Sequence, residues 1–153
     1  MRIAVTVVVL LALATGSPAA DDGAGAPAVD DATTRRAQAL ITKGDELAVK
    51  QDWEAAESHY REAVALAPQS AEAWYGLGSV LTMQERFAEA LPAFEEALRL
   101  EPTHPRALER LGETYVALGR PDDATAVLER LRPLDTTLAA TLAYVIRTGK
   151  GRW

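Results

Sequence analysis

The 153-residue chain contains no cysteine, and this absence removes several chemistries at once. Disulfide bonds, thiolate metal sites, haem attachment through C-x-x-C-H and cysteine nucleophiles are all excluded. Asparagine is also absent, so the chain has no acceptor for N-glycosylation. A fold built from this chain must therefore rely on its apolar core for stability.

Histidine is scarce as well, and its two positions give no sign of catalysis. His59 and His104 are 45 residues apart in the sequence, and no motif places a nucleophile or carboxylate beside either of them. His59 and Glu62 share a helix face, but two candidate ligands do not make a metal site. We therefore predict a protein that is not an enzyme, with no catalytic residue, no metal site and no cofactor.

Basic residues are fewer than acidic ones, 16 against 22, for a formal net charge of −6. This balance argues against nucleic acid or an anionic membrane as the partner. The charge is uneven, since residues 21–104 carry a net −9 and residues 105–153 a net +2. Two interpretations stay open: an ordinary solvated surface, or a gradient that orients a partner.

Residues 1–20 have the composition of a secretory signal peptide. Arg2 gives a positive start, residues 3–14 are apolar, and Ser17 to Ala20 are small enough for cleavage. A 12-residue stretch is shorter than the roughly 20 residues that span a bilayer. We expect cleavage, with no membrane association afterwards; the alternative is an uncleaved N-terminal anchor. Arginine outnumbers lysine 13 to 3, which suits a high-GC bacterium, so the predicted compartment is the periplasm, with secretion as the alternative.

The rest of the chain divides by composition. Residues 21–34 combine acidic residues with a Gly/Ala/Pro-rich run and read as a mobile linker. A helical domain is expected over 35–148, followed by a short tail over 149–153.

Within that domain one unit repeats every 34 residues. Gly44, Gly78 and Gly112 mark equivalent positions of three blocks, 37–70, 71–104 and 105–138. Apolar residues fall at positions 4 and 11 and again at 20, 24 and 27 of every block, and at position 7 of the second and third blocks, which is the spacing of two amphipathic helices. The glycines are expected where two helices approach closely, because a larger side chain would push them apart. A further apolar stripe over 137–148 predicts a C-terminal capping helix.

Start signals support these boundaries. Asp52, Ser70 and Asp135 precede three of the expected helices and can accept hydrogen bonds from their first free N–H groups. Gly119 is placed to end a helix, and Pro121 to open the next one. Pro133 is expected to shorten the second helix of the third block.

The repeat resembles the tetratricopeptide repeat, whose pattern is W-x2-L-G-x2-Y…A-x3-F…P. The middle block matches it best, through Trp74, Leu77, Gly78, Ala90, Phe94, Ala97 and Pro102. The resemblance covers residues 37–138, about two-thirds of the chain. It implies an all-α, right-handed solenoid of three helix-turn-helix repeats and a cap.

The resemblance also implies a function, since such arrays bind a protein or peptide partner on a concave surface lined by the first helix of each repeat. We expect an adaptor or assembly factor that holds an extended or helical segment there. Carrying the family's surface positions over to this sequence gives the candidate contacts Ile41, Asp45, Val49, Glu72, Tyr75, Ser79, Met83, Arg106, Arg110 and Glu113.

Four of these residues bear on the nature of the partner. Tyr75 is the expected anchor, because rigid aromatic residues dominate interfaces. Arg106 and Arg110 share a helix face and can grip a carboxylate, or they pair with Glu109 and Glu113 instead. The carboxylate clamp found in some members of the family is incomplete here, since only this arginine pair matches it, and Asp45 would repel a carboxylate.

A second function class is a self-associating structural scaffold, which would make the protein a homo-oligomer. Its candidate contacts lie at the C-terminal end: Tyr144, Arg147, Lys150, Arg152 and Trp153.

Overall fold

The computed structural model describes residues 31–151, and within them the chain is entirely α-helical and loop. Helical periodicity predicted this fold class, and it is confirmed. The helices are α1 (Asp31–Val49), α2 (Trp53–Leu66), α3 (Ala71–Met83), α4 (Phe87–Leu100), α5 (Pro105–Ala117), α6 (Pro121–Leu131) and α7 (Thr136–Thr148).

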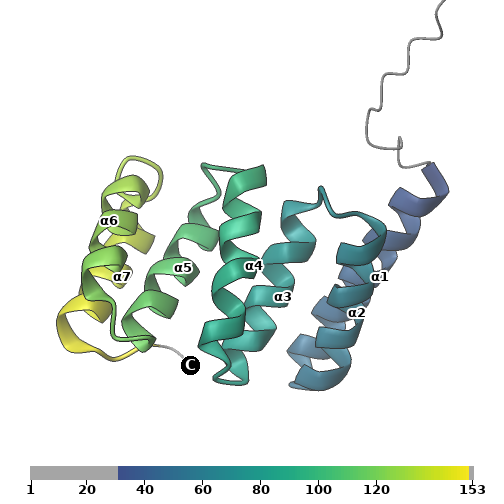
Figure 1. The fold of residues 1–153 in the computed structure, drawn as a ribbon, viewed down its shortest axis with the longest axis horizontal. Coiled ribbons are helices and arrows are strands. Elements are labelled where there is room, and N and C mark those ends of the chain that lie inside the picture. The colour runs from purple at the N-terminus through teal and green to yellow at the C-terminus, as the bar shows by residue number, and fades with distance from the viewer. Residues whose placement is uncertain (1–30, 152–153) are drawn as a thin grey trace, which may run out of the picture.

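The helices pair into three hairpins that stack in chain order across the molecule (Figure 1). Each hairpin corresponds to one 34-residue block, and α6 is shorter than α2 and α4, as Pro133 predicts. Along the array α1 contacts α3 and α3 contacts α5, whereas no contact joins α2 to α4 or α4 to α6 in the described residues. The first helices are therefore closer to one another than the second helices are, so they form the inner, concave layer.

Helix boundaries agree with the capping residues read from the sequence. The Asp52 carboxylate accepts a hydrogen bond from the Ala55 N–H at 3.3 Å. The Asp135 carboxylate accepts two hydrogen bonds, from the N–H groups of Thr137 and Leu138, both at 2.9 Å. Ser70 caps α3 through its hydroxyl. These side chains satisfy N–H groups that lack partners inside the helix.

The three equivalent glycines lie where a side chain from another helix crosses. A Cβ atom at Gly78 would come 2.8 Å from Phe94 Cε1, and one at Gly44 would come 2.8 Å from Tyr60 Cζ. At Gly112 the crossing side chain is Leu142 of α7, at 2.5 Å. The prediction of close helix approach at these positions is confirmed.

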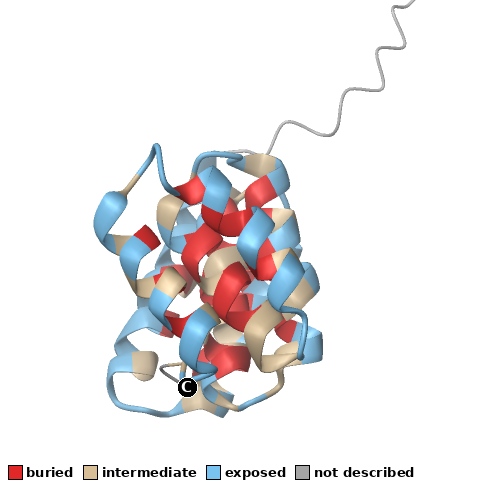
Figure 2. Cartoon of the chain, turned by 90° about the vertical axis from the view of Figure 1, so that its left-hand side faces the viewer, coloured by how far each residue is buried: buried red, intermediate tan, exposed pale blue. Residues whose placement is uncertain are grey.

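The core lies between the inner and outer helices and continues through all three hairpins (Figure 2). Phe94, Leu108 and Leu142 are fully buried within it. α7 packs on both α5 and α6, which closes the C-terminal end of this core. The prediction of a capping helix is therefore confirmed.

The N-terminal boundary differs from the expected one. Residues 31–34 belong to α1 and not to the linker, because Asp31 supplies a negative charge at the first helical turn. The predicted signal peptide, the linker up to residue 30 and the last two residues of the tail lie outside the described residues.

Across residues 31–151, no helix combines the length and apolar character needed to cross a membrane.

Candidate functional site

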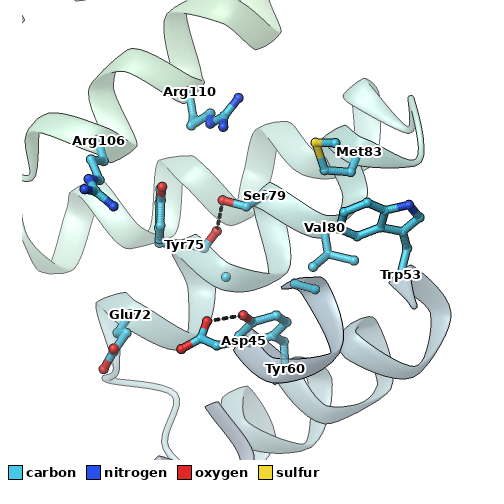
Figure 3. Close-up of a pocket in the computed structure, with 12 residues that line it drawn as sticks. Asp45, Trp53, Tyr60, Glu72, Tyr75, Ser79, Val80, Met83, Arg106 and Arg110 are labelled. Carbon is cyan, nitrogen blue, oxygen red and sulfur yellow. Dashed lines mark hydrogen bonds between the residues drawn. The ribbon is translucent and has the colours of Figure 1, made fainter. Parts of the chain in front are cut away.

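A hollow of about 340 Å³ lies on the concave layer, between α1, α3 and α5 (Figure 3). The helical period places one face of each of these helices toward it, so residues far apart in sequence meet there. Seven of the ten predicted contacts line this hollow: Asp45, Glu72, Tyr75, Ser79, Met83, Arg106 and Arg110.

Tyr75 stands in the middle of the hollow, half-buried, with a ring held by two neighbours. Its ring centroid is 6.2 Å from that of Phe94 and 5.1 Å from that of His104. His104 is itself fixed, because its Nδ1 accepts a 3.1 Å hydrogen bond from the Ala107 N–H at the start of α5. The structure thus gives Tyr75 the rigidity that an interface anchor requires.

Asp45 lies on one wall of the hollow and is tied to the core. The Tyr60 hydroxyl donates a 2.5 Å hydrogen bond to Asp45 Oδ1. Burial raises the pKa of the Tyr60 phenol above its usual value, and the bond to the Asp45 carboxylate raises it further. Tyr60 therefore stays protonated at neutral pH and keeps the carboxylate of Asp45 in place.

The two arginines of α5 lie on the opposite side of Tyr75 and differ in their partners. Arg110 donates a 2.9 Å hydrogen bond to the Glu113 carboxylate, which is fully buried. Arg106 is exposed and forms no ion pair with any residue of 31–151. Of the two interpretations offered by the sequence, pairing with a glutamate thus holds for Arg110 and does not hold for Arg106.

Three predicted contacts do not belong to the hollow. Ile41 is 2% exposed and packs in the core, because an aliphatic side chain gains more there than on a wet surface. Glu113 is 0% exposed, and its charge is neutralised inside the fold by Arg110. Val49 is exposed but lines a second, shallow hollow at the end of α1 with Thr42, Asp45, Glu46 and Lys50.

Five residues of the hollow were not among the predicted contacts: Ala48, Trp53, Tyr60, Gly76 and Val80. Trp53 and Val80 form its apolar end beside Met83, and Tyr60 reaches it from α2. Gly76 opens space for Tyr60, since a Cβ atom there would collide with the Tyr60 ring. Tyr60 occupies position 24 of its block, one of the apolar positions, and the 34-residue pattern has no signal for its hydroxyl reaching Asp45.

The histidines have structural positions. His104 caps α5, and His59 Nδ1 lies 2.8 Å from the Ala55 carbonyl oxygen within α2. In the described part of the chain, no group of three histidine or acidic residues is arranged to hold a metal ion.

Two family models, both described as tetratricopeptide repeat, match residues 41–105 and 81–143. Among curated proteins, the peroxisomal targeting signal receptor of Komagataella phaffii is 37% identical over 71 residues, 46% of this chain and 12% of that protein. The mouse DnaJ homolog subfamily C member 7 is 27% identical over 106 residues, 69% of this chain and 22% of that protein. The Hsp70-Hsp90 organizing protein of Triticum aestivum is 31% identical over 94 residues, 60% of this chain and 16% of that protein. The chain thus matches less than a quarter of the length of these relatives.

Solved structures show the same arrangement of helices. The first TPR of Spaghetti (RPAP3), bound to the HSP90 peptide SRMEEVD, is 20% identical with a TM-score of 0.72, over 76% of this chain and 94% of that one. The TPR2B domain of yeast Sti1, in its pHsp70 complex, is 22% identical with a TM-score of 0.72. The match covers 76% of this chain and 99% of that one. These likenesses establish the solenoid fold.

Proposed function

Because residues 41–143 belong to the tetratricopeptide repeat family, we propose that this protein is a non-catalytic interaction module that binds a partner segment in its concave hollow. The observation that carries the proposal is the hollow itself, with a braced aromatic ring at its centre and charged residues around it. The solved structure of the first TPR of Spaghetti, which has the same fold, contains a bound peptide, and this supports a peptide ligand here.

The site differs from a carboxylate clamp, and this bears on the partner. The two positions of the first repeat are occupied by Ile41, which is buried, and Asp45, which is acidic. Gly76 occupies the position required in the second repeat. The partner therefore need not resemble the chaperone peptides of the neighbouring structures.

We place this module in the bacterial envelope, as an adaptor or assembly factor. The support is in the sequence: a signal-like segment over 1–20, the absence of cysteine, and an arginine-rich, alanine-rich composition.

Self-association is the second candidate function, and the C-terminal helix favours it. Tyr144 is 50% exposed on α7, and the Arg147 guanidinium lies 5.8 Å from its ring centroid. Large exposed aromatic residues of this kind are common at interfaces. A second copy of the chain would be the partner in that case.

One pair of variants separates these functions. Tyr75→Ala with Arg106→Glu removes the anchor of the hollow and reverses a charge. Tyr144→Ala with Arg147→Glu makes the same chemical change on α7. We expect the first variant to lose its partner in crosslinking and pull-down from an envelope extract, with about 2 kcal/mol or more lost from binding. The second should keep the partner, and light scattering should find the wild type monomeric at all concentrations.

The opposite pattern would overturn the proposal. If the α7 variant loses the partner, or converts a wild-type oligomer to a monomer while the hollow variant does not, the working surface is α7. Circular dichroism must show that both variants retain the helicity of the wild type, since the Tyr75 ring also packs against Phe94 of the core.

A further inference from the structure

The hollow contains charges of both signs that the protein does not neutralise. Elsewhere in residues 31–151, exposed arginines commonly pair with a carboxylate three or four positions away, as Arg99 does with Glu96. Asp45, Glu72 and Arg106 form no ion pair among the described residues. Asp45 is bonded to the neutral Tyr60 hydroxyl, and Glu72 receives only a long 3.4 Å contact from the Gln38 amide.

These charges are sorted by sign on two sides of Tyr75 (Figure 3). Arg106 and Arg110 project from α5, whereas Glu72 and Asp45 lie on the side formed by α3 and α1. The two groups therefore face the same space without pairing across it. A ligand between them can meet both at once, and opposite potentials on the two walls fix its orientation.

The other end of the hollow is apolar. Trp53, Val80 and Met83 lie together there, away from Glu72 and Arg106. Met83 is 38% exposed, and its flexible thioether adapts to side chains of different shape. This end suits an aliphatic or aromatic side chain of a ligand.

Building on the proposed function, we propose that the hollow selects a short segment of mixed charge. A basic side chain of the segment lies against Asp45 and Glu72, a carboxylate lies against Arg106, and an apolar side chain enters the end formed by Trp53, Val80 and Met83. The acidic wall is the selective element, because it repels a purely acidic segment that the arginines alone would accept.

The length of the segment follows from helix geometry. Glu72 and Met83 are the ends of the lining along α3, and 11 residues at about 1.5 Å each separate them by about 17 Å. An extended chain rises about 3.3 Å per residue, so about five residues fill the hollow. The charged residues and the apolar residue should therefore fall within one such window.

The test uses the full chain and a phage-displayed library of random dodecapeptides. Peptides that bind are made synthetically with a fluorophore, and their dissociation constants are measured by fluorescence anisotropy. We expect the selected peptides to carry a basic, an acidic and an apolar residue within about five positions. Replacing the basic residue by glutamine should weaken binding about fivefold or more, the effect of one charge pair of about 1 kcal/mol.

Variants of the protein then assign each charge to its wall. In the double variant Asp45→Asn, Glu72→Gln, replacing the basic residue of the peptide should no longer change the dissociation constant. In the Arg106→Gln variant, replacing the acidic residue of the peptide should no longer change the dissociation constant. The control, Glu54→Gln with Asp122→Asn, removes the same charge from exposed positions on α2 and α6 and should bind like the wild type. Free and amidated peptides show whether the carboxylate is a side chain or the chain end.

Two results would overturn different claims. Peptides that need Tyr75 but lack a basic residue, or whose basic residue matters equally in the Asp45→Asn, Glu72→Gln variant, refute the mixed-charge segment and leave the proposed function intact. Peptides that bind equally well to Tyr75→Ala with Arg106→Glu, or a selection that enriches none, refute the proposed function itself.

Discussion

The Tyr60 hydroxyl and the Asp45 carboxylate, 2.5 Å apart, join the core of the first repeat to the wall of the hollow. The Tyr60 ring is 2% exposed and packs against Gly44 and Gly76, while its oxygen reaches a residue that is open to solvent. A single side chain therefore supports the fold and positions one charge of the candidate site.

Tyr60→Phe should lower the free energy of unfolding at neutral pH. It should also make that free energy fall less as the pH rises above 10. At neutral pH the lost hydrogen bond should cost about 1 kcal/mol of unfolding free energy. Below pH 10 the phenol is protonated in both states, so its contribution to stability is complete. Above pH 10 the unfolded chain releases the proton while the folded chain, with its raised pKa, retains it. The unfolding free energy of the wild type should therefore fall as pH rises beyond 10, and that of the variant should fall less.

Urea unfolding at several pH values from 8 to 11 measures both effects. Tyr144→Phe is the matched control, because Tyr144 is half exposed and, among the described residues, its hydroxyl is not held by a carboxylate as that of Tyr60 is. If Tyr60→Phe and the wild type lose stability in parallel above pH 10, the Tyr60–Asp45 bond does not control this dependence.

Gly78→Leu should destabilise the array severely. The new side chain would enter the crossing with Phe94, where even a Cβ atom comes within 2.8 Å of the ring. Overpacking of this kind costs about 1–3 kcal/mol or more, which should appear as a lower melting temperature in circular dichroism. Ala65→Leu makes a comparable enlargement at an exposed position of α2 and should melt like the wild type. Equal melting of both variants would mean that the assigned repeat register is incorrect.

Gly112 and Leu142 should behave as a coupled pair. Gly112→Ala places a methyl group against the Leu142 side chain, and Leu142→Ala leaves a cavity in a fully buried site, at a cost of about 2–5 kcal/mol. In the double variant the added methyl occupies part of the space that Leu142 vacates. The combined loss should thus be smaller than the sum of the single losses, by about 0.5–3 kcal/mol. Additive losses in chemical unfolding would show that α7 does not close on α5 as described.

The sequence was informative wherever one local rule decides the structure. The spacing of the glycines, the start residues Asp52, Ser70 and Asp135, and the apolar stripe of α7 each predicted a feature that the structure confirms. Capping by His104 was missed because histidine is not among the usual N-cap residues, and its ring nitrogen replaces the expected side-chain oxygen.

Side-chain destinations were harder to predict, because a repeat position fixes the face of a helix but not the depth of burial. Ile41 and Asp45 lie one turn apart on α1, yet the first turns into the core and the second stays on the surface. Arg106 and Arg110 are equally close in sequence, and only Arg110 finds a buried carboxylate. Such choices depend on neighbours from other helices, which a 34-residue pattern does not specify.

The walls of the hollow belong to successive hairpins, and α1 makes no contact with α5 within residues 31–151. The distance between the α1 wall and the α5 wall is therefore set by the angle at which each hairpin packs on the next. A segment that binds both walls is expected to link α1 to α5 and so to make the array more rigid. Conversely, a force that flattens the stack is expected to move the two walls apart and to weaken the binding of such a segment.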